Sequence, residues 1–206
     1  MPRISGVALA PAIRTVMIFI DGGYLRENLK KKWGVQKDEF SIKGFESLIG
    51  HRLLPHVPGR WEHIRTYYYD AIIDESTIEE IEEEEREKLK RKREKQKAFF
   101  SKISDLPFCD VRLGRLVYSE KEGFRQKGVD IRMTIDMLSK AYDGHYEFAI
   151  LVAGDGDFES LVDAVKDAGR RVIGAYYQDN ISPKLREMFD LRIILTREAL
   201  PPADAQ

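Results

Sequence analysis

Apolar runs of strand length recur along the chain, and amphipathic or polar segments lie between them. Runs without polar alternation are typical of strands covered on both faces of a sheet. The expected strands lie at 16–21, 63–72, 109–119, within 147–158, 170–177 and 191–196, and the expected helices at 22–34, 40–57, 76–103, 127–144, 159–169 and 182–189. This alternation predicts an α/β fold with a doubly wound, mainly parallel sheet and helices on both faces. We expect one domain over residues 1–206, with 1–14 as a loose N-terminal leader.

The segment 76–103 differs from the other expected helices because it is strongly charged. Its first half is acidic and its second half basic, which suits the helix macrodipole at both ends. Ser76 or Thr77 can cap it, and Phe99, Phe100 and Ile103 are expected to dock it on the domain. A solvated helix is the favoured interpretation, and an RNA-contacting basic arm between Lys88 and Lys97 is the alternative.

Charge and cysteine content narrow the class of protein. The 34 Lys and Arg residues against 35 Asp and Glu leave a formal net charge of −1, so no global field attracts nucleic acid, and any basic surface must be local. The single cysteine, Cys109, excludes an internal disulfide and is expected to be a small buried apolar residue. No apolar run reaches the roughly 18 residues of a membrane span, so we expect a cytoplasmic protein without a membrane partner.

Aspartates follow two of the apolar strands. Asp21 closes the first strand, and Asp155 and Asp157 follow the strand within 147–158. In an open parallel sheet the active crevice lies beyond the carboxyl ends of the strands, so neighbouring strands would bring these side chains together. Gathering anions is costly unless a cation is present. Mg²⁺ or Mn²⁺ prefers such oxygen ligands.

A fourth carboxylate is offered by the helix at 127–144. Asp130 stands at its opening, with Thr134 one turn later on the same face. Asp136 is about 240° further round the helix, so it is kept only as an outer-shell candidate. Each aspartate also has a structural alternative, since Asp21 can terminate a strand and Asp157 can cap a helix.

Other kinds of site fit the sequence poorly. The histidines are scattered without zinc-ligand spacing, at His51, His56, His63 and His145. The stretch from Gly154 to Glu159 begins like a dinucleotide loop, but Glu159 takes the third glycine position. Gly23 stands where a haloacid-dehalogenase-like phosphatase needs a second acid.

The blocks VMIFIDGGYL, KGVDIRMTIDML and ILVAGDGDFESLVDAVKDAGRRVIGAYY, with the tail ISPKLREMFDLRIIL, resemble the NYN domain family, the LabA-like group related to PIN-type and FLAP-type nucleases. The resemblance spans residues 16–195. It implies a PIN-like fold and a metal-dependent endoribonuclease that uses Mg²⁺ or Mn²⁺. By position, the implied catalytic and metal-binding residues are Asp21, Asp130, Asp155 and Asp157. Two positions depart from the family pattern, because Tyr24 replaces an asparagine and Ala153 replaces a serine or threonine.

One or two metal ions held by these carboxylates would activate water and stabilise charge on the scissile phosphate. Arg125 and Lys127 are candidates for holding a phosphate beside the site. Tyr24 could stack on a base, and Thr134 is a further candidate for substrate contact. Solvated loop cations and a packed ring are the structural alternatives.

A function without catalysis is the second hypothesis. The domain could bind RNA or a protein partner as a regulatory module, with the charged segment 76–103 as its interaction surface. A homo-oligomer through that segment belongs to the same hypothesis. Metal dependence discriminates the two, because a nuclease should stop when a chelator is added.

Overall fold

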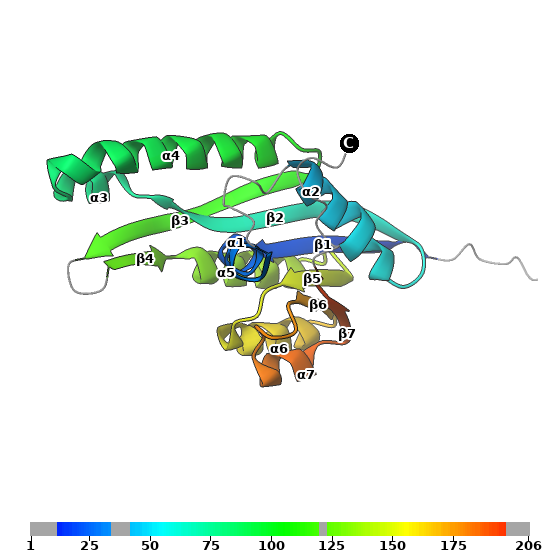
Figure 1. Cartoon of the computed structure of the whole chain (residues 1–206). Coiled ribbons are helices and arrows are strands. Elements are labelled where there is room, and N and C mark those ends of the chain that lie inside the picture. The colour runs from blue at the N-terminus through cyan, green and yellow to red at the C-terminus, as the bar shows by residue number, and fades with distance from the viewer. Residues whose placement is uncertain (1–11, 34–41, 120–122, 197–206) are drawn as a thin grey trace, which may run out of the picture.

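The computed structural model describes residues 12–33, 42–119 and 123–196 (Figure 1). Its core is one seven-stranded sheet in the order β4-β3-β2-β1-β5-β6-β7. The strands are β1 (Arg14–Asp21), β2 (Trp61–Ile73), β3 (Cys109–Ser119), β4 (Gly123–Lys127), β5 (Phe148–Val152), β6 (Arg171–Tyr176) and β7 (Leu191–Ile194). Residues 1–11 of the predicted leader lie outside the described residues, and β1 begins at Arg14.

The α/β class agrees with the prediction, and the sheet, which was predicted to be mainly parallel, is mixed. Six strands run parallel, whereas β4 pairs antiparallel with β3, from Gly123 against Ser119 to Lys127 against Arg115. No strand was predicted at 123–127. Most side chains of β4 are exposed, so the strand lacks the apolar pattern by which buried strands are recognised.

Helices cover both faces of the sheet. Along β1, Val16, Ile18 and Ile20 join one apolar cluster, while Met17 and Phe19 join the other, as the two-residue period of a strand requires. The first face carries α1 (Gly22–Trp33), α2 (Ile42–Ser47), the π-helical turn η1 (Leu48–Leu53), the 3₁₀ turn η2 (Leu54–His56) and α4 (Glu83–Ser104). The second carries α5 (Val129–Tyr142), α6 (Glu159–Asp167) and α7 (Pro183–Met188), and the short turn η3 (Gly156–Phe158) precedes α6.

The charged segment predicted as a single helix over 76–103 forms two helices, α3 (Glu75–Glu80) and α4. The chain is extended at Ile81, which lets Ile78 and Ile81 both pack with Ile73 and Leu89 in a separate apolar cluster. The Arg86 guanidinium satisfies the carbonyls of Ile78, Glu79 and Ile81 at the end of α3. Burial of the two isoleucines therefore outweighs helix continuity.

The structure also shows which residue caps the charged segment and which residues pack it against the sheet. Asp74, rather than Ser76 or Thr77, caps α3 by accepting from the Ser76 backbone N–H at 3.1 Å. Phe100 and Ile103 are buried against the sheet, as the sequence predicted, and α4 runs over β2 and β3 (Figure 1).

Two single predictions can be compared directly with the structure. Cys109 is buried at the start of β3, and burial raises the pKa of its thiol to about 11, which fits the expected apolar role. Within the described ranges, no helix has both the length and the hydropathy needed to cross a bilayer.

Candidate active site

The site lies at the carboxyl ends of β1 and β5, the two central parallel strands. Ile20 of β1 is in register with Val152 of β5, so Asp21 and the segment from Ala153 to Asp155 leave the sheet side by side. The chain turns into α1 on one face after β1 and into α6 on the other face after β5. This is the topological switch point at which open α/β sheets bind ligands.

A pocket of about 620 Å³ opens at this edge. Five of its lining residues are acidic, and the described residues that line it include no Lys, Arg or His. The lining residues are Asp21, Gly23, Tyr24, Glu27, Gln126, Asp130, Gly154, Asp155, Gly156, Asp179, Asn180, Ile181 and Ser182. Three of the four predicted acids, Asp21, Asp130 and Asp155, therefore share one pocket. Asp157 does not line it.

The carboxylates of the pocket raise one another's pKa values. The pKa of Asp21 is raised from 3.8 to about 6, first by burial and then by the charges of Asp130 and Asp70, whereas the backbone N–H of Tyr24 lowers it. The pKa of Asp130 is also raised, first by burial and then by the charges of Asp155 and Asp157. Asp157 thus lies within electrostatic range of the pocket. The site is one in which added negative charge is unfavourable and a cation is favoured.

The raised pKa of Asp21 has a consequence for stability without metal. The folded state keeps this proton to higher pH than the unfolded chain does, so the free energy of unfolding falls as pH rises from about 4 to about 6. Asp21→Asn removes the penalty, which is at most about 3 kcal/mol. In chelator at pH 7.5, urea unfolding should show the variant more stable than the wild type, with the difference gone below pH 4. An equal gain for the exposed Asp167→Asn, or a loss of stability at pH 7.5, would contradict this assignment.

Asp155 and Asp157 sit in the turn after β5. One Asp155 oxygen accepts from the Asp157 backbone N–H at 3.0 Å, so Asp155 caps η3, whereas Asp157 was the residue considered for a capping role from the sequence. Asp21 similarly accepts from the Tyr24 backbone N–H at 2.9 Å at the start of α1. Both backbone contacts fix the carboxylates at the mouth of the pocket.

The chemistry of the donor set suits a hard divalent cation, because carboxylate oxygens dominate the pocket and no positive side chain stands among the described residues of its lining. Over the described parts of the chain, however, no three His, Cys, Asp or Glu side chains are close enough together to hold one metal ion. The acids surround the cavity rather than converging on one point.

A buried ion pair lies beneath Asp21. Asp70 on β2 is fully buried, and Arg26 of α1 contacts its Oδ1 through Nη2 at 2.5 Å. The Tyr68 hydroxyl donates to Asp70 at 3.2 Å, and the Ala71 backbone N–H donates to it at 2.7 Å. Arg26 also donates to the Gly22 carbonyl, so the pair ties the first turn of α1 to the sheet next to the pocket. The sequence pattern did not indicate this pair.

Tyr24 holds a loop that lines the pocket. Its hydroxyl donates to the Asn180 carbonyl at 2.6 Å and accepts from the Tyr177 backbone N–H at 2.9 Å. Asn28, itself buried, bridges the Tyr24 carbonyl and the Asn180 side chain. The ring lines the pocket, but its hydroxyl is already used, and stacking on a base remains a prediction for the ring alone. Ala153, the other departure from the family pattern, is fully buried and does not line the pocket.

The remaining predicted residues lie around the pocket rather than in it. Asp136 contacts the Tyr69 hydroxyl at 3.1 Å, Lys140 at 3.3 Å and Arg112 at 3.6 Å. It therefore points away from Asp130, as the helical geometry predicted. Arg125 is exposed on β4 and Thr134 is half-buried on α5, and neither lines the acidic pocket. Lys127 lines a second, separate pocket.

The structure adds two acids that were not predicted from the sequence. Glu27 lies on α1, six residues after Asp21, and Asp179 follows β6 at the same edge of the sheet. Asp179 carried the signal already used for Asp155, an acid just after a buried parallel strand. Glu27 had no such signal, because only the angle at which α1 leaves the sheet brings it to the cavity.

Comparisons with known proteins agree with this architecture. A protein of unknown function from Vibrio parahaemolyticus has a similar solved structure, with a TM-score of 0.60, 16% identity, and coverage of 93% of this chain and 99% of that one. At this identity the likeness concerns the fold alone. No curated protein matches the sequence. The sequence model of the NYN domain matches residues 15–196, which is most of the chain. The chain belongs to the NYN domain family.

Proposed function

We propose that this protein is a metal-dependent ribonuclease, an endoribonuclease acting in the cytoplasm, that hydrolyses RNA phosphodiester bonds at the acidic pocket. NYN membership suggests a nuclease-like function in general. The observation that carries the specific proposal is the pocket itself, in which five carboxylates gather at the switch point of the sheet without a basic neighbour in the described lining. Such a site rejects a bare phosphodiester and accepts one only together with cations.

Asp21, Asp130 and Asp155 are the proposed metal-binding residues, with Asp157 contributing its charge from the rim. Mg²⁺ or Mn²⁺ held there would supply an activated water and a positive charge for the scissile phosphate. The protein contributes positioning. Asp21 and Asp155 are fixed by backbone N–H groups, and the Arg26–Asp70 pair fixes the start of α1. The Tyr24 hydrogen bonds hold the segment from Asp179 to Ser182 at the wall of the cavity.

The direct test is cleavage of labelled single-stranded and structured RNA by the wild-type protein. We expect endonucleolytic products with Mg²⁺ or Mn²⁺ and none after addition of excess chelator, with activity restored by added metal. The products should be separated on denaturing gels over time. If the protein binds RNA but leaves it intact with every metal, the nuclease proposal is wrong. The result would then support the hypothesis of a regulatory module that binds without catalysis.

One observation favours the second function, binding of RNA or of a protein partner without cleavage. The basic half of α4 carries exposed cations that do not line the acidic pocket, at Lys88, Lys90, Arg91, Lys92 and Lys97. Self-association through this helix would be seen as a concentration-dependent mass. The cleavage assay in chelator and in metal discriminates this function from catalysis.

A further inference from the structure

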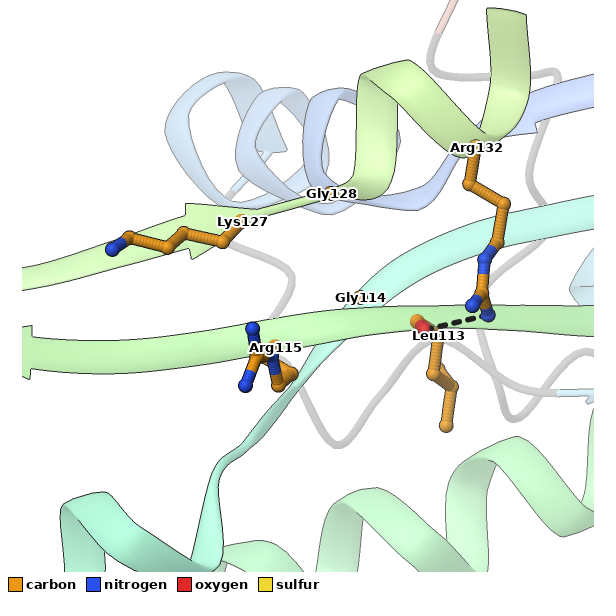
Figure 2. A pocket seen from close by; sticks show the side chains of 6 residues that line it. All are labelled: Leu113, Gly114, Arg115, Lys127, Gly128 and Arg132. Carbon is orange, nitrogen blue, oxygen red and sulfur yellow. Dashed lines mark hydrogen bonds between the residues drawn. The ribbon is translucent and has the colours of Figure 1, made fainter. Parts of the chain in front are cut away.

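A second pocket lies on the other side of the connection between β4 and α5. Its volume is about 260 Å³, and its lining residues are Leu113, Gly114, Arg115, Lys127, Gly128 and Arg132. Three of these six residues carry positive charge, and none of the six is acidic. Figure 2 shows Arg132 reaching from α5 to β3, with Arg115 and Lys127 at the other end of the pocket.

The cations of this pocket are poorly neutralised by the described residues around them. Arg115 and Lys127 are directly opposite each other in the β3–β4 ladder, an arrangement in which like charges destabilise a sheet. Asp74 lies 3.8 Å from Arg115, at the outer limit of an ion pair, and the Arg115 side chain is 70% exposed. Arg132 donates to the Leu113 carbonyl at 2.9 Å, which orients the guanidinium without neutralising its charge. An anion beside Arg115 and Lys127 would relieve the repulsion between these two side chains.

The backbone brings these groups together through a glycine. A side chain at Gly114 would meet the Lys127 carbonyl at 2.6 Å and Val129 at 2.7 Å. Glycine therefore allows β3 to approach the junction of β4 and α5. Arg115, the next residue of β3, points to the opposite face, where Asp74 lies, and Arg132 reaches the pocket from α5.

The basic pocket and the acidic pocket share one connection. Gln126 and Asp130 line the acidic pocket, whereas Lys127, Gly128 and Arg132 line the basic one. A chain that spans this junction would therefore meet both pockets. A repeating polyanion fits that arrangement. One of its phosphates would bind through metal at the carboxylates of the acidic pocket, and a neighbouring phosphate would bind directly to the positive side chains of the basic pocket.

We propose that the basic pocket binds a backbone phosphate of the RNA strand whose scissile phosphate lies in the acidic pocket. This inference rests on the proposed function. Arginine presents a planar fork that matches phosphate oxygens, and lysine adds a point charge. Because the acidic pocket repels RNA and the net charge of the chain is −1, this local positive charge supplies the attraction that docks the strand.

The test is binding of a fluorescent single-stranded RNA in excess chelator, measured by anisotropy over a series of KCl concentrations. Arg115→Gln/Lys127→Gln is compared with Arg186→Gln/Arg192→Gln, a matched removal of two exposed charges near the opposite edge of the sheet. The pocket variant should bind at least tenfold more weakly at low salt. Its slope of log K against log salt should become shallower by about 0.7 for each phosphate that the variant no longer neutralises. The charge-conserving swap Arg115→Lys/Lys127→Arg should restore most of the binding, and thermal melts establish that each variant is folded.

The outcomes distinguish the proposed phosphate site from the proposed nuclease function. Equal binding and equal slopes for the pocket and control variants overturn the phosphate site, whether or not the wild type cleaves RNA. A shallower slope in a protein that never cleaves RNA supports the phosphate site and counts against the nuclease. A wild type that binds polyglutamate through Arg115 and Lys127 but does not bind RNA overturns the assignment in favour of an acidic protein partner.

Discussion

Asp155→Asn is expected to leave the protein folded and to abolish metal-stimulated RNA cleavage. Asparagine can accept the same backbone hydrogen bond from Asp157, so the turn after β5 should persist. It cannot supply the negative charge that a divalent cation requires at the pocket. A metal contributes several kcal/mol to stabilising the transition state, so the loss in kcat should reach about a thousandfold or more.

The measurement is single-turnover cleavage of labelled RNA at saturating Mg²⁺ or Mn²⁺, with a thermal melt of the same preparation. Asp167→Asn, an exposed change on α6 of identical chemistry, is the matched control and should cleave at the wild-type rate. Wild-type activity in Asp155→Asn would remove the carboxylate pocket from the mechanism.

The second large effect concerns stability. Asp70→Asn should lower the free energy of unfolding by about 3 kcal/mol, since removing one partner leaves Arg26 without its buried counter-charge. The change is nearly isosteric, so the loss is electrostatic rather than a cavity effect. The double variant Arg26→Gln/Asp70→Asn should recover much of it, because no uncompensated charge remains.

Urea unfolding at pH 7.5 in chelator measures both variants. Asp110→Asn is the control, because Asp110 forms an ion pair with Arg65 at 3.1 Å in which each side chain is more than a third exposed. Such an ion pair should contribute less than about 1 kcal/mol to the free energy of unfolding. A loss in Asp70→Asn no greater than in this control would show that the buried pair does not hold the start of α1.

Much of the fold was predictable because buried parallel strands carry a strong local signal. Helices cover both faces of β1 and β5, so the buried residues 16–20 and 148–152 of these strands are all apolar. The edge strand β4 was not predicted, because most of its side chains face water rather than a helix and it therefore has no apolar run. The break between α3 and α4 also escaped prediction, since it depends on a distant apolar cluster around Ile73.

The candidate site was predictable in part for the same reason. Acids placed at the ends of Val- and Ile-rich strands indicated one edge of the sheet, and the pocket there contains Asp21 and Asp155. The strand order was not contained in that pattern. Only the pairing of β1 with β5 makes these two acids neighbours.

By itself the sequence determined the α/β class and the acids at one edge of the sheet, because strand burial and strand-end chemistry are local properties of the chain. The NYN family was indicated by the resemblance of its sequence blocks. Tertiary structure decided which groups surround those acids. It brought Glu27 and Asp179 to the acidic pocket and set Arg115 opposite Lys127 in the basic one. Such placements depend on strand pairing and helix exit angles, which are fixed by packing between segments far apart in the sequence.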